Sequence, residues 1–579
     1  MRSTRRSTFR ILLSGLVLSA GLAILIYRLF ALQVVRADEL SHLAGHQHEK
    51  TVPIEGERGT IKDRNGKILA TNVKVPSIYG VPGLVENSKT AAGRLGRILG
   101  VKAELIRRRL STGKKFVWID RRVSPEEAQR VQLAGLSGIG QLEESRRFYP
   151  KRQLMGHLLG FAGLDNRGLE GIELFYDSAL RGEEGWVVLE RDAHGQSVFP
   201  KDLDYALPSR GMDLVLTVDE VVQHIAEREL DRAMDATQAL GGTVVVMDPR
   251  TGEILALAVR PTFNPNQIAD HEPGEWRIRA VTDTYEPGST VKIVAASAAL
   301  EKGLATPDDL FYCEKGRMEM AGGPMRDHEE EEYLTFREVI QKSSNICTVK
   351  IAMRVGEEDL YRVFRDFGFG EKTGIDLPGE SPGLIRSPKS WSGRSLASLS
   401  IGHELLVTPI QVVTAVSALA NGGWLVRPFL VSEVRSADGR TVNRILPQMR
   451  HQVVSAETAS LMVSILEGTV NGDGTGLKAA VPGYRVAGKT GTAQKIDPET
   501  GRYSKKETVV SFVGIVPADD PKLVVLVVVD GPKEDAWASQ TAAPLFRRVV
   551  EPVLHYMGVP PMNPRDDVVV ASTAAAGVK

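Results

Sequence analysis

The sequence predicts an α+β protein whose largest domain is built on one antiparallel β-sheet and is preceded by a membrane-spanning helix. Strand-like runs lie at both ends of the region 211–559, and a long helical stretch, roughly 289–480, separates them. Strands that come from both ends of a domain, with helices between them, are typical of α+β architecture. A basic N-terminus followed by an apolar run indicates the membrane helix.

The N-terminal segment combines arginines with a long apolar run. Four arginines precede residue 11, and the first acidic residue is Asp38. About 16 apolar or small residues at ~1.5 Å each give roughly 24 Å, and the run resumes after Arg28, whose side chain can reach the membrane surface. We expect a transmembrane anchor over 11–35, with residues 1–10 in the cytoplasm and the rest of the chain outside. A cleaved signal peptide is the alternative, but no clean A-x-A site follows the run.

Residues 36–210 are mixed in character and carry many turn signals. Asn65-Gly66 lies between two short β-like runs and indicates a hairpin. Residues 86–135 are rich in helix-forming and basic side chains. We expect an irregular, elongated pedestal that spaces the following domain away from the membrane.

The domain 211–559 begins with a predicted helix over 219–234, with Asp219 near its start. Two β-rich runs, 242–247 and 253–259, are joined by a turn that contains proline and glycine. Three further strand-like runs follow near the C-terminus, at 484–487, 508–516 and 523–529. Residues 560–579 are rich in proline, alanine and valine and are predicted to be a disordered tail.

Composition and the spacing of cysteine and histidine argue against nucleic-acid binding and metal binding. The 579 residues include 72 Lys+Arg and 72 Asp+Glu, so the net charge is zero, whereas a nucleic-acid-binding domain is expected to be basic. Cys313 and Cys347 could pair, but they form no CxxC motif and no disulfide framework, and the preferred interpretation is two unpaired, small apolar side chains. His42, His46 and His48 have loose metal-like spacing, but linker is the preferred interpretation. We expect no metal and no cofactor.

The first chemical motif is Ser289-Thr290-Val291-Lys292, directly after Pro287-Gly288 and at the start of a helical run. Lys292 lies one helical turn from Ser289, and a neutral lysine there can take the hydroxyl proton. That role requires a pKa roughly 3 units below the ordinary ~10.4, which burial and a second cation can provide. Ser-x-x-Lys alone is weak evidence: Ser111 and Lys114 form the same pattern, which we interpret as a solvated turn.

The second motif is Ser343-Ser344-Asn345, between two predicted helices. A hydroxyl and an amide in such a loop suit a proton relay and a contact to a substrate amide. The alternative is simple helix capping by serine and asparagine.

The third motif is Lys489-Thr490-Gly491-Thr492, which follows one strand-like run and precedes two others. A glycine in a strand allows another backbone to approach closely. We therefore expect Lys489 on an edge strand beside Ser289, where a peptide could add as a further strand. The same three letters occur at Lys372-Thr373-Gly374, which we interpret as a loop.

Together, in this order, the three motifs resemble those of the monofunctional class B penicillin-binding proteins, with Asn345 matching the last position of the second motif. The resemblance covers nearly the whole chain, and residues 58–66, 211–219, 399–411 and 511–514 look like further blocks of the family. It implies a penicillin-binding transpeptidase fold, an antiparallel sheet with helices on both sides, on a dimerisation-type pedestal over 36–210.

The resemblance also implies roles for individual residues. Ser289 would be the acylated nucleophile and Lys292 its base. Ser343 would relay the proton with Lys489, and Asn345 would hold the substrate backbone. Thr490, Gly491 and Thr492 would bind the substrate, and the N–H groups of Ser289 and Thr492 would form an oxyanion hole, a type of interaction that contributes about 3–4 kcal/mol per donor.

The implied reaction is D,D-transpeptidation: the enzyme takes the D-Ala-D-Ala end of one peptidoglycan stem peptide, releases D-alanine and passes the acyl group to an amine on another. β-Lactams would be inhibitors. The pedestal looks more like that of the septal, FtsI-like branch, whose partner would be a membrane glycosyltransferase of the FtsW type. The alternatives are an elongation-type transpeptidase, a D,D-carboxypeptidase or β-lactamase with water as acceptor, a divisome scaffold and a β-lactam sensor.

One position departs from the family pattern. At Gly402-His403-Glu404 the commonest pattern has glycine in place of Glu404. Lineage variation is one interpretation; the other is a carboxylate that aids hydrolysis of the acyl-enzyme.

Overall fold

The computed structural model describes residues 2–37, 50–54, 56–114, 116–191, 197–198, 205–206, 209–321, 323–497 and 500–562. These residues form two compact units, one from Met1–Glu57 with Gly182–Arg210 and one from Arg58–Arg181 with Gly211–Lys579. The three histidines at 42–48 and most of the predicted tail lie outside the described residues.

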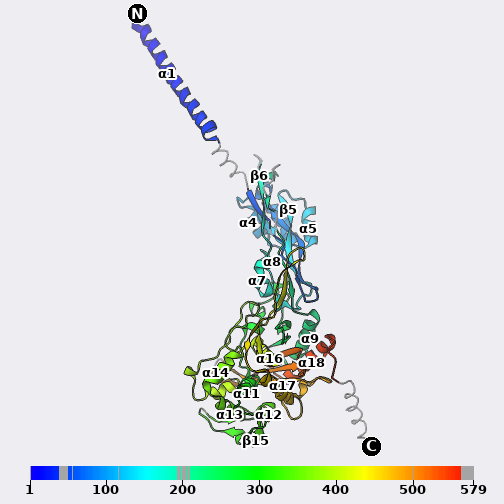
Figure 1. Cartoon of the computed structure of the whole chain (residues 1–579). Helices are drawn as coiled ribbons and strands as arrows, with labels where there is room; N and C mark the ends of the chain where they lie inside the picture. The colour runs from blue at the N-terminus through cyan, green and yellow to red at the C-terminus, as the bar shows by residue number, and fades with distance from the viewer. Residues whose placement is uncertain are drawn as a thin grey trace. The chain divides into compact units, whose positions relative to one another are not determined.

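The first unit contains the predicted anchor. Helix α1 (Arg2–Phe30) continues into a π-helical turn, η1 (Ala31–Val35) (Figure 1). The segment Ile11–Val35 has a mean hydropathy of 2.0 and is, in the part of the chain that the structure describes, the one helix long and apolar enough to cross a membrane. The same unit holds β1 (Lys50–Ile54), antiparallel to β6 (Gly185–Arg191).

The second unit begins with residues 58–181, which are more regular than predicted. Strands β2 (Ile61–Lys62) and β3 (Ile68–Gly80) form the hairpin predicted at Asn65-Gly66, and β5 (Ile139–Phe148) pairs along β3. The predicted helical stretch forms α3 (Ser88–Leu99), α4 (Ala103–Leu110) and α5 (Pro125–Leu133), which close a small apolar core over this sheet.

A buried ion network lies at the start of this region. Arg58 and Arg147 both pair with Glu173, which is fully buried, and Arg58 also pairs with Asp177. Buried charges are tolerated when they are paired and hydrogen-bonded, as these are. The network ties the chain at Arg58 to the short helix α7 (Gly171–Phe175).

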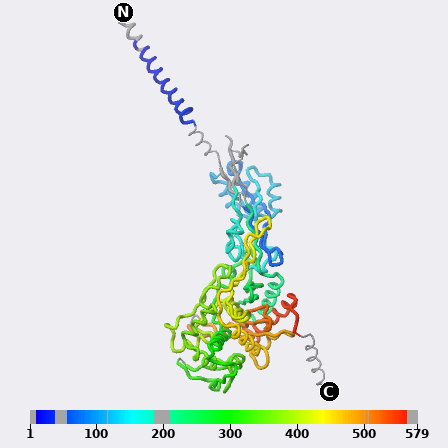
Figure 2. The backbone as a smooth tube through the Cα atoms, viewed as in Figure 1, coloured from blue at the N-terminus to red at the C-terminus, as the bar shows by residue number. Residues whose placement is uncertain are grey.

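The rest of the second unit is built on the predicted antiparallel sheet, with strand order β11-β10-β22-β21-β20. Its strands are β10 (Gly241–Met247), β11 (Ile254–Arg260), β20 (Ala487–Ile496), β21 (Tyr503–Val516) and β22 (Leu523–Asp530). The N-terminal hairpin joins the C-terminal strands where β10 pairs with β22, so the prediction that strands come from both ends is confirmed (Figure 2).

Helices cover both faces of this sheet, as predicted. Helices α9 (Glu220–Thr237) and α18 (Ala542–Tyr556) pack on one face, and α16 (Pro409–Ala420) packs on the other (Figure 1). The Asp219 side chain caps α9 by accepting from the N–H groups of Val221 and Val222. The predicted strand at 484–487 is placed too early, because β20 begins at Ala487 and contains the third motif itself.

The middle of the domain is less helical than predicted. It contains α11 (Lys292–Glu301), α12 (Phe336–Gln341), α13 (Asn345–Val355), α14 (Glu357–Asp366), α15 (Ser395–Ser400) and α17 (Ala456–Val470). Short strands interrupt them, among them β17 (Val431–Arg435), which pairs with β9 (Asp213–Leu216). These strands are only two to five residues long, too short to show a clear alternation in the sequence.

Cys313 and Cys347 form a disulfide, so the prediction that they are unpaired is wrong. Cys313 follows β12 (Leu310–Tyr312), Cys347 lies on α13, and their Cα atoms are 5.3 Å apart. They are 34 positions apart in the sequence. Only the folding of the intervening segment onto α13 brings them together, and spacing alone carries no sign of this.

Replacing both Cys313 and Cys347 with alanine is expected to lower the free energy of unfolding by about 2–4 kcal/mol, because the unfolded chain gains the entropy of an open loop. Denaturant unfolding of the purified chain, with and without reductant, measures the change. The double variant serves as the control, since reductant should affect only the wild type. A wild-type chain whose stability reductant leaves unchanged would contradict the disulfide.

Candidate active site

Ser289 lies in a short 3-10 turn, η5 (Gly288–Val291), that leads directly into α11. The hydroxyl of Thr290 donates to the carbonyl of Pro287 at 2.9 Å and tightens the turn. Ser289 is partly buried, whereas Lys292 in the first turn of α11 is fully buried. The amide groups at the start of a helix are free of intrahelical partners, which favours a developing negative charge there.

Lys292 joins the first motif to the second. Its Nζ donates to the carbonyl of Ser343 at 2.6 Å and to the side-chain Oδ1 of Asn345 at 2.7 Å, and it lies 3.2 Å from the hydroxyl of Ser343. Ser343 has a left-handed backbone, with φ of +62°. This turn between α12 and α13 directs both oxygens of Ser343 toward the same ammonium group.

Ser344, between these two residues, has a different task. Its hydroxyl accepts from the N–H of Cys347 at 3.1 Å and caps α13. Capping therefore explains Ser344, while Ser343 and Asn345 face Lys292. Helix capping, one interpretation of this motif, therefore applies to Ser344, and contact with the site, the other interpretation, applies to Ser343 and Asn345.

The third motif lies on β20, which is the edge strand of the sheet, as predicted. A Cβ atom on Gly491 would lie 2.8 Å from the carbonyl of Pro287 and 2.6 Å from the hydroxyl of Ser511. A Cβ atom on Gly288 would lie 2.9 Å from the carbonyl of Thr492. Such contacts are too short for a side chain, so glycines at both positions allow the strand and the Ser289 turn to approach each other.

Lys489 is fully buried, and among the residues that the structure describes its Nζ has no hydrogen-bond partner. Burial and the positive charge of Lys292 hold the pKa of Lys489 well below its usual value. Burial lowers the pKa of Lys292 to about 7, while the carboxylate of Asp327 acts in the opposite direction. At neutral pH a large fraction of Lys292 is therefore unprotonated, and burial is the main cause.

The two threonines of the third motif have different neighbours. Thr490 is buried, and its hydroxyl lies 2.7 Å from that of Thr475 in the loop after α17. Thr492 is partly exposed, and its hydroxyl accepts from the N–H of Ala538 at 3.4 Å. Sequence reasoning missed both Thr475 and Asp327; Thr475 follows a glycine-rich stretch, but nothing in the sequence marks Asp327.

The second copies of the Lys-Thr-Gly and Ser-x-x-Lys patterns lie outside this site and have structural explanations. The backbone N–H and the hydroxyl of Thr373 both donate to Glu380 at 2.6 Å, so this copy of the motif stabilises a loop. Ser111 ends α4 and is exposed, as predicted for a solvated turn.

The departure from the family pattern lies against the Ser289 turn. The N–H of Gly288 donates to the carbonyl of Gly402 at 3.2 Å. Glu404 has a φ of +57°, which glycine adopts more easily, and its carboxylate accepts from the hydroxyl of Ser395 at 2.7 Å. Its N–H donates to Glu286, and burial raises the pKa of Glu286.

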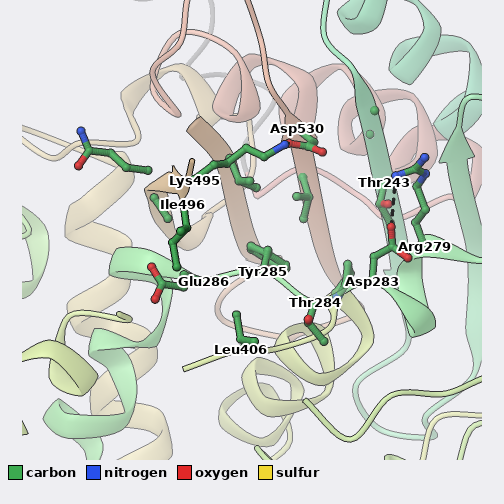
Figure 3. A pocket seen from close by; sticks show the side chains of 17 residues that line it. Thr243, Arg279, Asp283, Thr284, Tyr285, Glu286, Leu406, Lys495, Ile496 and Asp530 are labelled. Atoms are coloured by element: carbon green, nitrogen blue, oxygen red, sulfur yellow. Dashed lines mark hydrogen bonds and ion pairs between the residues drawn. The ribbon is translucent and has the colours of Figure 1, made fainter. Parts of the chain in front are cut away.

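A cavity of about 310 Å³ opens next to this turn (Figure 3). Tyr285 and Glu286, just before Pro287, form part of its lining, and Lys495 and Asp530 pair across its rim at 2.9 Å. The lining does not include Ser289, Lys292 or Lys489. Within the described residues no three His, Cys, Asp or Glu side chains gather to hold a metal ion.

An antiparallel sheet covered by helices on both faces, with a serine and a buried lysine at the start of a helix beside its edge strand, is typical of the serine enzymes that react with penicillins, which include penicillin-binding proteins and class A β-lactamases. Residues 242–551 match the family model of the penicillin-binding protein transpeptidase domain, and residues 53–216 match that of the penicillin-binding protein dimerisation domain. The chain belongs to this family.

Similar proteins extend over nearly the whole chain. Stage V sporulation protein D of Bacillus subtilis is 39% identical over 96% of this chain and 87% of its own length. Peptidoglycan D,D-transpeptidase FtsI of Escherichia coli is 31% identical over 95% of this chain and 92% of its own. The crystal structure of penicillin-binding protein 3 from Mycobacterium tuberculosis with aztreonam has 30% identity and a TM-score of 0.69, and covers 89% of this chain and 99% of its own.

Replacing Gly491 with alanine is expected to slow acylation by benzylpenicillin by about tenfold or more, because the added methyl group pushes β20 away from the Ser289 turn. Rates of adduct formation measure the effect. Gly93→Ala is the matched control, since a Cβ atom there meets nothing within 4 Å. Equal rates for both variants would show that the close approach has no role in acylation.

Proposed function

We propose that this enzyme crosslinks peptidoglycan stem peptides as a D,D-transpeptidase, through an acyl-enzyme on Ser289. The observation that carries the proposal is the buried Lys292, whose pKa is about 7 and whose ammonium group contacts Ser343 and Asn345. A lysine of this kind, one turn from a serine, can act as the base that activates it. The printed names of the Escherichia coli and Neisseria relatives, peptidoglycan D,D-transpeptidases, agree with this chemistry.

In the proposed acylation, neutral Lys292 takes the proton of the Ser289 hydroxyl while the Ser289 oxygen attacks the carbonyl of the penultimate D-alanine. The N–H groups of Ser289 and Thr492 hold the oxyanion. Ser343, which lies next to Lys292, passes a proton to the leaving amine with the help of Lys489. The peptide bond breaks, D-alanine leaves, and the donor stem is held as an ester on Ser289.

In the second half of the reaction an amine of another stem peptide attacks the ester. The amine loses a proton to the same relay, the new peptide bond forms, and Ser289 regains its proton. Asn345 and the Thr490-Gly491-Thr492 edge of β20 hold the donor, whose backbone adds beside the strand. Before acylation, Thr490 and Thr492 bind the carboxylate of the terminal D-alanine, which then leaves.

The finer assignments are also proposals. We infer an anchor in the cytoplasmic membrane with the N-terminus inside, from the arginines before the span. We place the pedestal at 36–210 and the transpeptidase domain at 211–559, after a cytoplasmic tail (1–10) and the anchor (11–35). A septal role with a glycosyltransferase of the FtsW type follows from the likeness to FtsI. The 39% identity to a sporulation protein supports a role in sporulation as the second candidate.

Labelling with benzylpenicillin separates these chemistries. We expect a stable one-to-one adduct on the wild type, seen by intact mass over hours, and none on Ser289→Ala, because the ester forms on this hydroxyl. An adduct that disappears in seconds would favour a carboxypeptidase or β-lactamase, with water as acceptor. A wild type without an adduct would leave a scaffold role, and an adduct without crosslinking of stem peptides would favour a β-lactam sensor.

Glu404→Gly tests the carboxylate beside the nucleophile turn. We expect the release rate of bound penicillin to stay the same, because Ser395 already engages this carboxylate and glycine suits the left-handed backbone. Mass spectrometry of the adduct over time gives the rate, with Ser395→Ala as the companion variant. Slower release from Glu404→Gly would instead assign hydrolysis to the carboxylate.

A further inference from the structure

We propose that Asp327 is a positioning residue of this site: its carboxylate fixes the turn that carries Ser343 and Asn345 and thereby places both against Lys292. The inference rests on the proposed function, because it concerns how Lys292 and its neighbours are held ready for acylation. Asp327 lies outside the three motifs, in the segment between β12 and α12.

The carboxylate makes three hydrogen bonds to the start of α13. Its Oδ2 accepts from the hydroxyl of Ser344 at 2.6 Å. Its Oδ1 accepts from the N–H of Asn345 and, at 3.1 Å, from the N–H of Ile346. These amide groups belong to the first turn of a helix, where no preceding carbonyl can serve them. A charged acceptor at this end of a helix is stabilised by the helix dipole as well.

Asp327 is itself held in place by its own segment. Its N–H donates to the carbonyl of Gly316 at 3.1 Å, and it directly follows β14 (Met325–Arg326), which pairs with β13 (Arg317–Met318). The Cys313–Cys347 disulfide ties the beginning of this segment to α13. The segment is therefore attached to α13 at two points, by a covalent bond at Cys313 and by the carboxylate of Asp327.

The same segment decides how the Asn345 amide is turned. Its Nδ2 donates to the carbonyl of Arg326 at 2.9 Å, so its Oδ1 is the atom that faces Lys292 at 2.7 Å. The backbone of Asn345 is held by Asp327, and the side chain is held by the residue before Asp327. Loss of the carboxylate would free the turn that presents Ser343 and Asn345 to the ammonium group.

Asp327 also acts on Lys292 through its charge. Its carboxylate raises the pKa of Lys292, against the effect of burial. Lys489 on β20 and His403 in the loop after α15 lie within electrostatic reach of Lys292: burial first, and then the charge of Lys292, lowers the pKa of each. Asp327 thus opposes the effect of burial and keeps the pKa of Lys292 from falling further, so that protonated Lys292 is available to return a proton.

The test compares Asp327→Asn and Asp327→Ala in the full-length chain in detergent, by the rate of acylation by benzylpenicillin as a function of pH. We expect Asp327→Ala to lose about tenfold or more, because the turn is released. Asp327→Asn keeps an amide oxygen for the N–H groups of α13 and should recover much of the rate. The acidic limb of its pH–rate profile should move to lower pH, since without the carboxylate Lys292 loses its proton more easily.

Glu330→Gln, at an exposed acidic residue three positions on, is the matched control and should leave both the rate and the limb unchanged. If Asp327→Ala does not fold, Asp327→Asn still decides. The proposal would be overturned if Asp327→Asn had the same acylation rate and the same acidic limb of the pH–rate profile as the wild type, and Asp327→Ala were also unimpaired. A uniform loss of rate in Asp327→Asn with the limb unmoved would also overturn it, because that result indicates a merely structural role.

The two proposals fail in different ways. An unlabelled wild type would contradict the proposed function. The pKa of Lys292 can then still be read directly, by NMR of chain labelled with carbon-13 lysine. A lower value in Asp327→Asn than in the wild type would support the role of Asp327, and equal values would overturn it.

Discussion

The site depends on two lysine side chains that are buried close to each other. An ammonium group loses its hydration on burial, and a second positive charge nearby adds repulsion, so at least one of the two tends to give up its proton. Lys292 regains part of the lost hydration through hydrogen bonds to Ser343 and Asn345 and through the charge of Asp327. Lys489 has no such hydrogen bond in the described structure. This inequality makes Lys292 the group that can exchange a proton near neutral pH.

The sheet makes this arrangement possible. Pairing of β10 with β22 brings the two ends of the domain into one layer, and leaves β20 as an edge strand. Because β20 has no neighbour on its outer side within the sheet, its backbone groups are available to a peptide. Glycines at 288 and 491 then bring this edge to the Ser289 turn within van der Waals distance. Strand pairing, burial and the position of Ser289 are thus parts of one geometry.

Much of the fold and the outline of the site could be predicted from local patterns. The α9 helix with its Asp219 cap, the hairpins and the long strands β10, β21 and β22 follow from periodicity and turn residues. The start of β20 and the short strands between α11 and α17 could not, because runs of a few residues carry no distinct periodicity. The disulfide and Asp327 were missed for a different reason: their partners lie 34 and about 18 positions away, and no spacing rule connects them.

By itself the sequence determined the chemistry that this protein carries: an apolar N-terminal span, a serine with a lysine one helical turn on, and two further motifs in a set order. Those features are local, since they depend on hydrophobicity and on residues a few positions apart. Only the tertiary structure decided how far burial lowers the pKa of Lys292, whether Cys313 and Cys347 pair, and which residues hold the second motif in place. These properties arise from desolvation and from contacts between segments distant in the chain, and so they exist only once the chain is folded.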